Sequence, residues 1–221
     1  MTLRLHYHPF SSFCQKVLIA LYEKGAAFER EVVDLGDPGS RAAFEAVWPL
    51  GKFPVLVDEA RGATIPESSV IIRYLDRHHA GGTRLIPDDP EAALRVDLLD
   101  RLFDAYVELP LQKVVGDRLR PEDRRDPHGV EEARTLLGRI YGVLEGELSD
   151  SGWAAGDAFT LADCAAAPAL FYANIVRPFG THPHLRAYYE RLLARPSVAR
   201  AVDEARPYRD FFPLEWPDSY R

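Results

Sequence analysis

The sequence contains little cysteine: only Cys14 and Cys164 among 221 residues, far apart in the chain. Two cysteines are too few for a disulfide scaffold or a cysteine-based zinc site, and this usage is typical of a reducing compartment. None of the seven histidines has the His-Glu-x-x-His spacing that places two metal ligands on one helix face. We therefore expect neither a disulfide framework nor a metal centre.

Positive charge and long hydrophobic runs are also scarce. The 27 Lys and Arg are outnumbered by 34 Asp and Glu, which gives a net charge of -7 and disfavours nonspecific binding to nucleic acid or anionic membranes. The most apolar segment, Cys164 to Val176, contains Pro168 and Asn174 and is too short to span a bilayer, so we expect a buried helix. The N-terminal residues lack the apolar stretch of a secretory signal. We expect a cytoplasmic protein with no nucleic-acid or membrane partner.

The first 79 residues mix strand and helix patterns. Alternation over 3–7 predicts a strand, apolar residues at helical spacing over 14–22 predict a helix, and 28–33 predicts a second strand. Two strands joined by a helix should be parallel, with a right-handed crossover. The remaining elements are expected as a short helix near 41–46, strands at 54–57 and 64–65, and a helix over 70–78. The predicted order is β-α-β-α-β-β-α.

Beyond a Gly- and Pro-rich linker at 80–90, every periodic segment is helical. One apolar stripe is expected to face the core, and comprises Leu98, Leu99, Leu102, Phe103, Tyr106 and Val107. The aromatic residues over 206–221 predict an ordered tail packed on the body. An α/β unit followed by an all-helical unit indicates two domains, which we place at 1–80 and 90–221.

A Ser-Ser-Phe-Cys segment connects the first strand to the first helix. Ser11 or Ser12 can cap this helix, and capping is the simplest interpretation of both. The alternative is a binding site, because open amides and the helix dipole at a helix N-terminus stabilise an anion such as a thiolate. Cys14 lies on the apolar stripe of the helix, so we expect an inert buried thiol.

Two further segments could contribute to a site. Phe53-Pro54 stands between a glycine-containing loop and a strand, and a cis bond there would turn the Phe53 backbone outward as a docking edge. Glu67-Ser68 opens the helix over 70–78, where an acid and hydroxyls are ordinary capping residues. The same pair could also bind a ligand with an amine and a carboxylate, Glu67 taking the ammonium and Ser68 the carboxylate.

Taken together, these motifs resemble the cytosolic glutathione transferase family over essentially the whole chain. The resemblance rests on Ser11 in its turn, the segment from Pro49 to Pro54, Glu67-Ser68 before a helix, and Thr160-x-x-Asp163 downstream of a glycine. It implies a thioredoxin-like first domain that binds glutathione and a helical second domain that shapes the electrophile site. Thr160 and Asp163 resemble the capping box of a buried helix.

The resemblance also implies residue roles. Ser11 resembles the catalytic hydroxyl of the serine-type classes, which donates a hydrogen bond to the glutathione sulfur. Glu67 and Ser68 resemble the pair that binds the γ-glutamyl group, Phe53 the residue whose backbone pairs with the cysteinyl part, and Lys52 the position that meets the glycine carboxylate. Candidates for the apolar wall of the electrophile site are Phe10, Phe103, Tyr106 and Val107, although the last three also fit plain helix core.

The implied activity is conjugation of glutathione, as co-substrate and without another cofactor, to a small apolar electrophile. The resemblance also implies a homodimer. Trp48 stands where many members have Asn, and Phe53 where Val or Ile is usual, so the class stays open. Tyr7 invites a tyrosine-type assignment, but Ser11 fits the turn better. Two alternatives remain: a glutathione-dependent disulfide or peroxide reductase, and a non-catalytic scaffold of the same fold.

Overall fold

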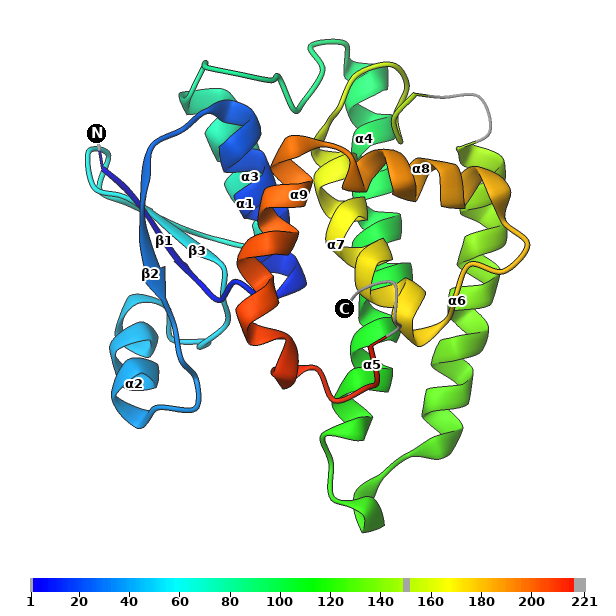
Figure 1. Ribbon diagram of the computed structural model, residues 1–221. Coiled ribbons are helices and arrows are strands. Elements are labelled where there is room, and N and C mark those ends of the chain that lie inside the picture. Colours follow the sequence, from blue (N-terminus) through cyan, green and yellow to red (C-terminus); the bar gives the residue numbers. More distant parts are fainter. Residues whose placement is uncertain (1, 149–151, 217–221) are drawn as a thin grey trace.

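The computed structural model describes residues 2–148 and 152–216, and its first half follows the predicted order of elements (Figure 1). The elements of this half are β1 (Leu3–Tyr7), α1 (Ser12–Lys24), β2 (Phe28–Val32), α2 (Pro38–Val47), β3 (Val55–Asp58), β4 (Ala63–Pro66) and α3 (Ser68–His78). Proline is tolerated directly before β3 because no ladder donor is lost there. The predicted mixture of an α/β unit and a helical unit is confirmed.

The four strands form one mixed sheet in the order β2-β1-β3-β4. β1 and β2 are parallel, as expected for strands joined by a helix, while β1–β3 and β3–β4 are antiparallel. The register pairs His6 with Val55 and Val55 with Pro66. The end of β1, the start of β3 and the end of β4 therefore meet at one edge of the sheet.

In the second half, the regular elements of the described residues are all helices. Its elements are α4 (Pro90–Leu102), the π-helical η1 (Phe103–Glu108), α5 (Leu109–Arg118), the 3₁₀ turn η2 (Glu122–Arg124), α6 (Pro127–Glu147), α7 (Leu161–Val176), α8 (Pro183–Leu193), α9 (Pro196–Ala205) and the 3₁₀ turn η3 (Arg206–Phe211). None of the helices in the described ranges has the length and apolar character needed to cross a membrane.

Helix α7 forms the centre of the helical half, as its apolar sequence predicts. Almost all of its residues are buried, which confirms the buried helix expected over 164–176. The predicted capping box is present at its start, where the Asp163 carboxylate accepts the Thr160 N–H at 2.8 Å. Figure 1 shows α1 and α3 lying between the sheet and this helical half.

Helix α1 is buried on more sides than its single apolar stripe predicts. Gln15 and Lys16 are 2% and 1% exposed. The Gln15 amide donates to the Tyr172 hydroxyl of α7, whereas Lys16 faces α3, α4 and η1. The Lys16 ammonium lies 2.6 Å from Asp100 and 2.8 Å from Asp104, and it donates to Ser69 at 2.9 Å. This pairing permits the burial of the charge and joins α1 to α3 and α4.

The predicted stripe through 98–107 is wrong at two positions. Leu98 and Tyr106 are 54% and 47% exposed, whereas Asp104 and Glu108 are buried. Leu98 precedes the π-helical segment η1, and α4 buries Val96 and Leu99 instead. At Tyr106 the cause is η1 itself, whose wider turn changes the register relative to an α-helix. Acidic side chains four residues apart thus turn inward toward α1.

The tail packs on the body as far as the structure describes it. Phe212 is buried, and the Trp216 indole N–H donates to the Arg209 carbonyl at 3.1 Å. The rings of both residues contact the ring of Phe10. The expected tail continues to residue 221, and 217–221 lie outside the described residues.

Candidate functional site

The first component of the candidate site is the turn before α1. Ser11 is the N-cap residue, with extended backbone, and its hydroxyl accepts the Cys14 N–H at 3.4 Å. A hydroxyl that accepts one hydrogen bond keeps its own hydrogen for donation. Tyr7, the other hydroxyl considered, is only 2% exposed at the end of β1. Ser11, half-buried and at a helix N-terminus, is therefore the better placed of the two.

The second component is the loop before β3. The Phe53–Pro54 peptide bond is cis, as the sequence suggested. The ring of Phe53 stacks on His8, which follows β1, with 6.2 Å between ring centroids. Lys52 is exposed beside it. The loop therefore borders the same edge of the sheet as the turn that carries Ser11.

The third component is the junction between β4 and α3. Glu67 lies directly before α3 rather than in its first turn, is exposed, and makes no capping hydrogen bond. Its backbone φ of 69° is unfavourable for a residue other than glycine. Backbone strain of this kind is common at functional sites. Ser68 is the first residue of α3 and is buried. The strand register places this junction beside Pro54.

A cavity of about 220 Å³ opens next to Ser11. Phe10, Ser11 and Ser12 form the part of its wall that comes from the α/β half. The rest comes from the helical half and the tail, through Glu108, Leu111, Gln112, Val115, Tyr172, Phe211 and Phe212. The sequence prediction missed these residues because they come together only through the packing of α5, α7 and η3 against α1.

Three predicted wall residues lie elsewhere. Phe103 and Val107 are fully buried core residues, and Tyr106 is half-exposed; none of the three lines either cavity described here. After the π-helical segment, the residues that line the small cavity are Leu111 and Val115, one and two helical turns after Val107. The spacing of Val107, Leu111 and Val115, four residues apart, was the available signal.

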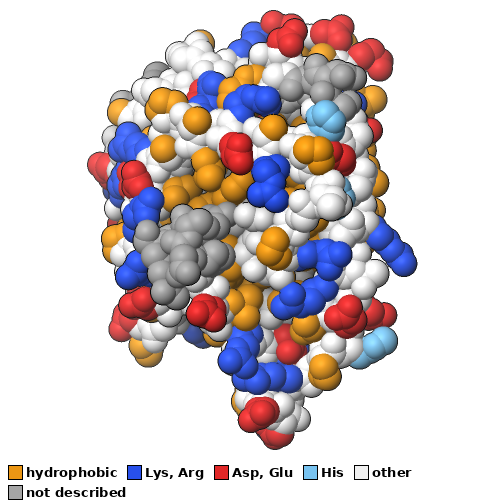
Figure 2. Space-filling model, turned by 45° about the vertical axis from the view of Figure 1, so that its right-hand side comes forward, with side chains coloured by type: hydrophobic (Ala, Val, Ile, Leu, Met, Phe, Trp, Pro, Cys, Tyr) orange, Lys and Arg blue, Asp and Glu red, His pale blue; other side chains and the backbone are white. Residues whose placement is uncertain are grey.

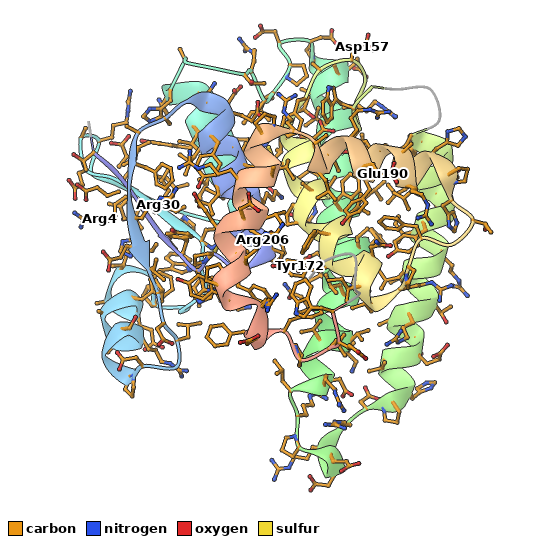
Figure 3. All side chains as sticks on the ribbon, viewed as in Figure 1. Arg4, Arg30, Asp157, Tyr172, Glu190 and Arg206 are labelled. Atoms are coloured by element: carbon orange, nitrogen blue, oxygen red, sulfur yellow. The ribbon has the colours of Figure 1, made fainter. Side chains whose placement is uncertain are left out.

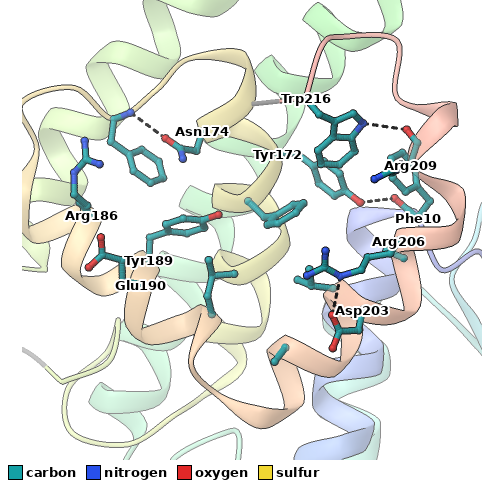
Figure 4. A pocket seen from close by; sticks show the side chains of 16 residues that line it. Phe10, Tyr172, Asn174, Arg186, Tyr189, Glu190, Asp203, Arg206, Arg209 and Trp216 are labelled. Atoms are coloured by element: carbon teal, nitrogen blue, oxygen red, sulfur yellow. Dashed lines mark hydrogen bonds and ion pairs between the residues drawn. The ribbon is translucent and has the colours of Figure 1, made fainter. Parts of the chain in front are cut away.

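A second cavity, of about 490 Å³, lies on the other side of Phe10 and Tyr172 (Figure 4). Figure 2 shows hydrophobic side chains gathered in a hollow with basic and acidic side chains around it. The wall of this cavity is built by α7, α8, α9 and the tail. It contains no residue of the turn at Ser11 other than Phe10, so the smaller cavity is the candidate reaction site.

Tyr172 separates the two cavities and connects the two halves of the chain. It belongs to α7 and lies beside the N-terminal end of α1 in Figure 3. Its hydroxyl donates to the Phe10 carbonyl at 3.1 Å and accepts from the Gln15 amide at 2.9 Å. These bonds fix the wall of the small cavity against the turn that carries Ser11.

Two ionisable groups near the small cavity, the Cys14 thiol and the Glu108 carboxyl, have raised pKa values. Burial raises the pKa of the Cys14 thiol to about 12, so this cysteine is neutral and inert near pH 7, as expected. Burial also raises the pKa of Glu108 to about 7. Among residues 2–148 and 152–216, no cluster of His, Cys, Asp and Glu is suited to hold a metal ion.

Comparison with known proteins shows two family matches. Residues 5–83 match the model described as "Glutathione S-transferase, N-terminal domain", and residues 113–196 match "Glutathione S-transferase, C-terminal domain". A glutathione S-transferase of Silene vulgaris is 31% identical, over 91% of this chain and 97% of that protein.

Two solved structures have the same fold over most of their length. A glutathione S-transferase of Methylobacillus flagellatus, with glutathione bound, is 28% identical with a TM-score of 0.81, over 90% of this chain and 98% of that one. A glutathione S-transferase of Methylobacterium radiotolerans, in complex with glutathione sulfonate, is 31% identical with a TM-score of 0.78, over 91% and 94%.

Proposed function

The chain belongs to the glutathione S-transferase family, and we therefore propose that it is a glutathione transferase that conjugates the glutathione thiolate to a small apolar electrophile. The observation that carries this proposal is the meeting of two helix N-termini and the Phe53–Pro54 loop at one sheet edge, next to an apolar cavity. The edge offers polar groups for a peptide, and the cavity offers an apolar surface for its reaction partner.

The sheet edge supplies complementary groups for glutathione. Glu67 binds the ammonium of the γ-glutamyl group, and the Ser68 hydroxyl with the open amides of α3 binds its carboxylate. The backbone of Phe53 pairs with the cysteinyl part, and Lys52 meets the glycine carboxylate. The exposed position of Glu67 and Lys52 supports these roles, because a ligand can reach both side chains from solvent.

Ser11 activates the sulfur by donating its hydroxyl hydrogen to the thiolate. A free thiol has a pKa of about 8.5, so only a few per cent is thiolate at pH 7. Lowering that pKa by about two units requires ~2.7 kcal/mol of thiolate stabilisation. A charge-assisted hydrogen bond and the N-terminus of α1 can together supply a contribution of this size.

The electrophile binds in the small cavity between Phe10, Leu111 and Tyr172. The sulfur electron pair forms a bond to the electrophilic carbon, and the leaving group, such as a halide, departs with its own bonding pair. Holding both reactants side by side supplies the remaining rate enhancement. No metal or prosthetic group takes part in this reaction.

The reductase alternative has less support than conjugation. Cys14, the cysteine nearest to the turn, is fully buried with a raised pKa, so it is a poor nucleophile for disulfide exchange. Parallel assays with glutathione and either a chloroarene or a mixed disulfide separate the two activities. Conjugation of the chloroarene supports the proposal; turnover of the disulfide alone supports the reductase, and activity with neither supports a scaffold.

We further propose that the protein is a homodimer through the outer face of α3 and α4. Val70, Leu94 and Leu98 are exposed there, each by more than half, with Tyr106 close to half-exposed. The ion pair between Arg73 and Asp97 shows that the two helices lie side by side. An exposed apolar row of this kind is typical of an interface between subunits.

A further inference from the structure

One buried carboxyl group adjoins the small cavity and has no role in the reaction as described so far. Glu108 ends the π-helical segment, is 3% exposed, and contributes to the cavity wall. Its Oε1 accepts hydrogen bonds from the Ser12 hydroxyl at 2.6 Å and from the Gln112 amide at 3.0 Å. Within the described part of the chain, its Oε2 has no hydrogen-bond partner.

The charges that face Glu108 come from two elements. Burial is the largest cause that raises the pKa of Glu108 to about 7, and the hydrogen bonds from Ser12 and Gln112 oppose it. Asp104, one turn earlier, raises this pKa further, while Lys16 of α1 lowers it. The Lys16 ammonium is already shared by Asp100 and Asp104, so none of the described residues forms an ion pair with Glu108. Its other polar neighbours are neutral: Ser12, Gln112 and, across the cavity, Tyr172.

A thiolate formed beside Ser11 would bring a second negative charge into this enclosed space. Two anions that share a low-dielectric site repel each other, and the site then favours holding one proton between them. If the thiol proton moves to Glu108, the net charge of the cavity does not change. If the proton leaves for solvent instead, the thiolate and the carboxylate must remain together.

We infer that Glu108 accepts the proton of the glutathione thiol through the hydroxyl of Ser12, an inference that rests on the proposed function. The S–H bond breaks and its electron pair stays on sulfur. The proton goes to Ser12 Oγ as the hydrogen of Ser12 passes to Glu108 Oε1. After the product forms, Glu108 releases its proton to solvent. The overall reaction therefore releases one proton together with the anionic leaving group, so charge is conserved.

The test counts protons released when glutathione binds, measured with a pH indicator at pH 8. At this pH, wild-type Glu108 is mainly carboxylate and takes up the thiol proton, so little proton is released to the buffer. Glu108→Gln keeps an oxygen that accepts from Ser12 but does not titrate. This variant should release about one proton per glutathione bound as thiolate.

Two further variants separate the proton balance from the rate and from the substitution itself. Ser12→Ala leaves the carboxyl in place, so its proton count should match the wild type while thiolate formation in a stopped-flow experiment slows by about 100-fold. Glu145→Gln makes the same chemical change in α6, where the carboxylate accepts the N–H groups of His184 and Leu185. This control should behave as the wild type in both measurements.

The outcomes are distinct. Equal proton release by the wild type and Glu108→Gln, with thiolate present in both, overturns the inference and leaves the proposed function intact. If Glu108→Gln does not fold, Ser12→Ala decides, because unslowed thiolate formation in that variant overturns the relay. Failure of the wild type to bind glutathione overturns both proposals.

Discussion

Substitution of Glu67 should lower the affinity for glutathione without lowering the stability of the fold. The Glu67 carboxylate is exposed and caps no helix, while its unfavourable φ of 69° belongs to the backbone and persists in alanine. Glu67→Ala should therefore change the free energy of unfolding by less than about 0.5 kcal/mol. The same substitution leaves the ammonium of bound glutathione without its carboxylate.

The expected loss of affinity follows from the exposure of this side chain. A charge-assisted hydrogen bond contributes roughly 1.5–3 kcal/mol, and an exposed carboxylate belongs at the lower end. A loss of about 1.5–2 kcal/mol weakens glutathione binding by roughly 10- to 30-fold. Titration calorimetry measures the affinity, and thermal unfolding of the same samples measures the stability.

A matched variant lies at the opposite edge of the sheet. Glu59 is 44% exposed in the turn after β3 and pairs with Arg4 at 3.0 Å. Glu59→Ala should leave glutathione affinity unchanged. Equal affinities for the wild type and Glu67→Ala would remove Glu67 from the site and refute the assignment of the β4–α3 junction as the γ-glutamyl site.

Three further predictions test other parts of the molecule. Cys14→Ala should retain conjugation activity and lose stability of about 1 kcal/mol, since the thiol only fills the core; loss of turnover in a folded variant would argue for a chemical role. The wild type should have a dimer mass by light scattering at micromolar concentration, and Leu94→Glu with Leu98→Glu should give a monomer; a monomeric wild type contradicts the proposed interface. Thr160→Ala should lower the free energy of unfolding by about 1–2 kcal/mol in a denaturant melt, with glutathione affinity unchanged; an unchanged melt would show that the capping box does not stabilise α7.

The sequence predicted the elements whose signals are local. The period change between residues 3–7 and 14–22 and the capping serine at position 11 both appear in the structure. The cis bond before Pro54 is also present, although the resemblance to the family implied it more strongly than the residues alone. The order of strands and helices followed from these signals because each element carries its own periodicity and end signals. The sequence also indicated the buried α7 and its capping box at Thr160.

The parts that the sequence did not predict depend on contacts between distant segments. Lys16 is buried because Asp100 and Asp104 reach it from α4 and η1, and the π-helical turn that allows this also exposes Tyr106. A prediction that assumes α-helical spacing throughout this segment cannot reveal a π-helical turn. The role of Glu108 likewise depends on its hydrogen bond to Ser12, 96 positions earlier in the chain.

In the proposed mechanism, Ser11 stabilises the thiolate of bound glutathione. Thiolate absorbance of the glutathione complex, titrated against pH for the wild type and Ser11→Ala, tests it most directly. We expect the wild-type thiol to titrate about two pH units below the reference pKa of ~8.5. The midpoint of the variant should be at least about one unit higher than that of the wild type, because a charge-assisted hydrogen bond contributes roughly 1.5–3 kcal/mol. Coincident titrations of the two proteins would contradict it and leave Ser11 as a helix cap alone.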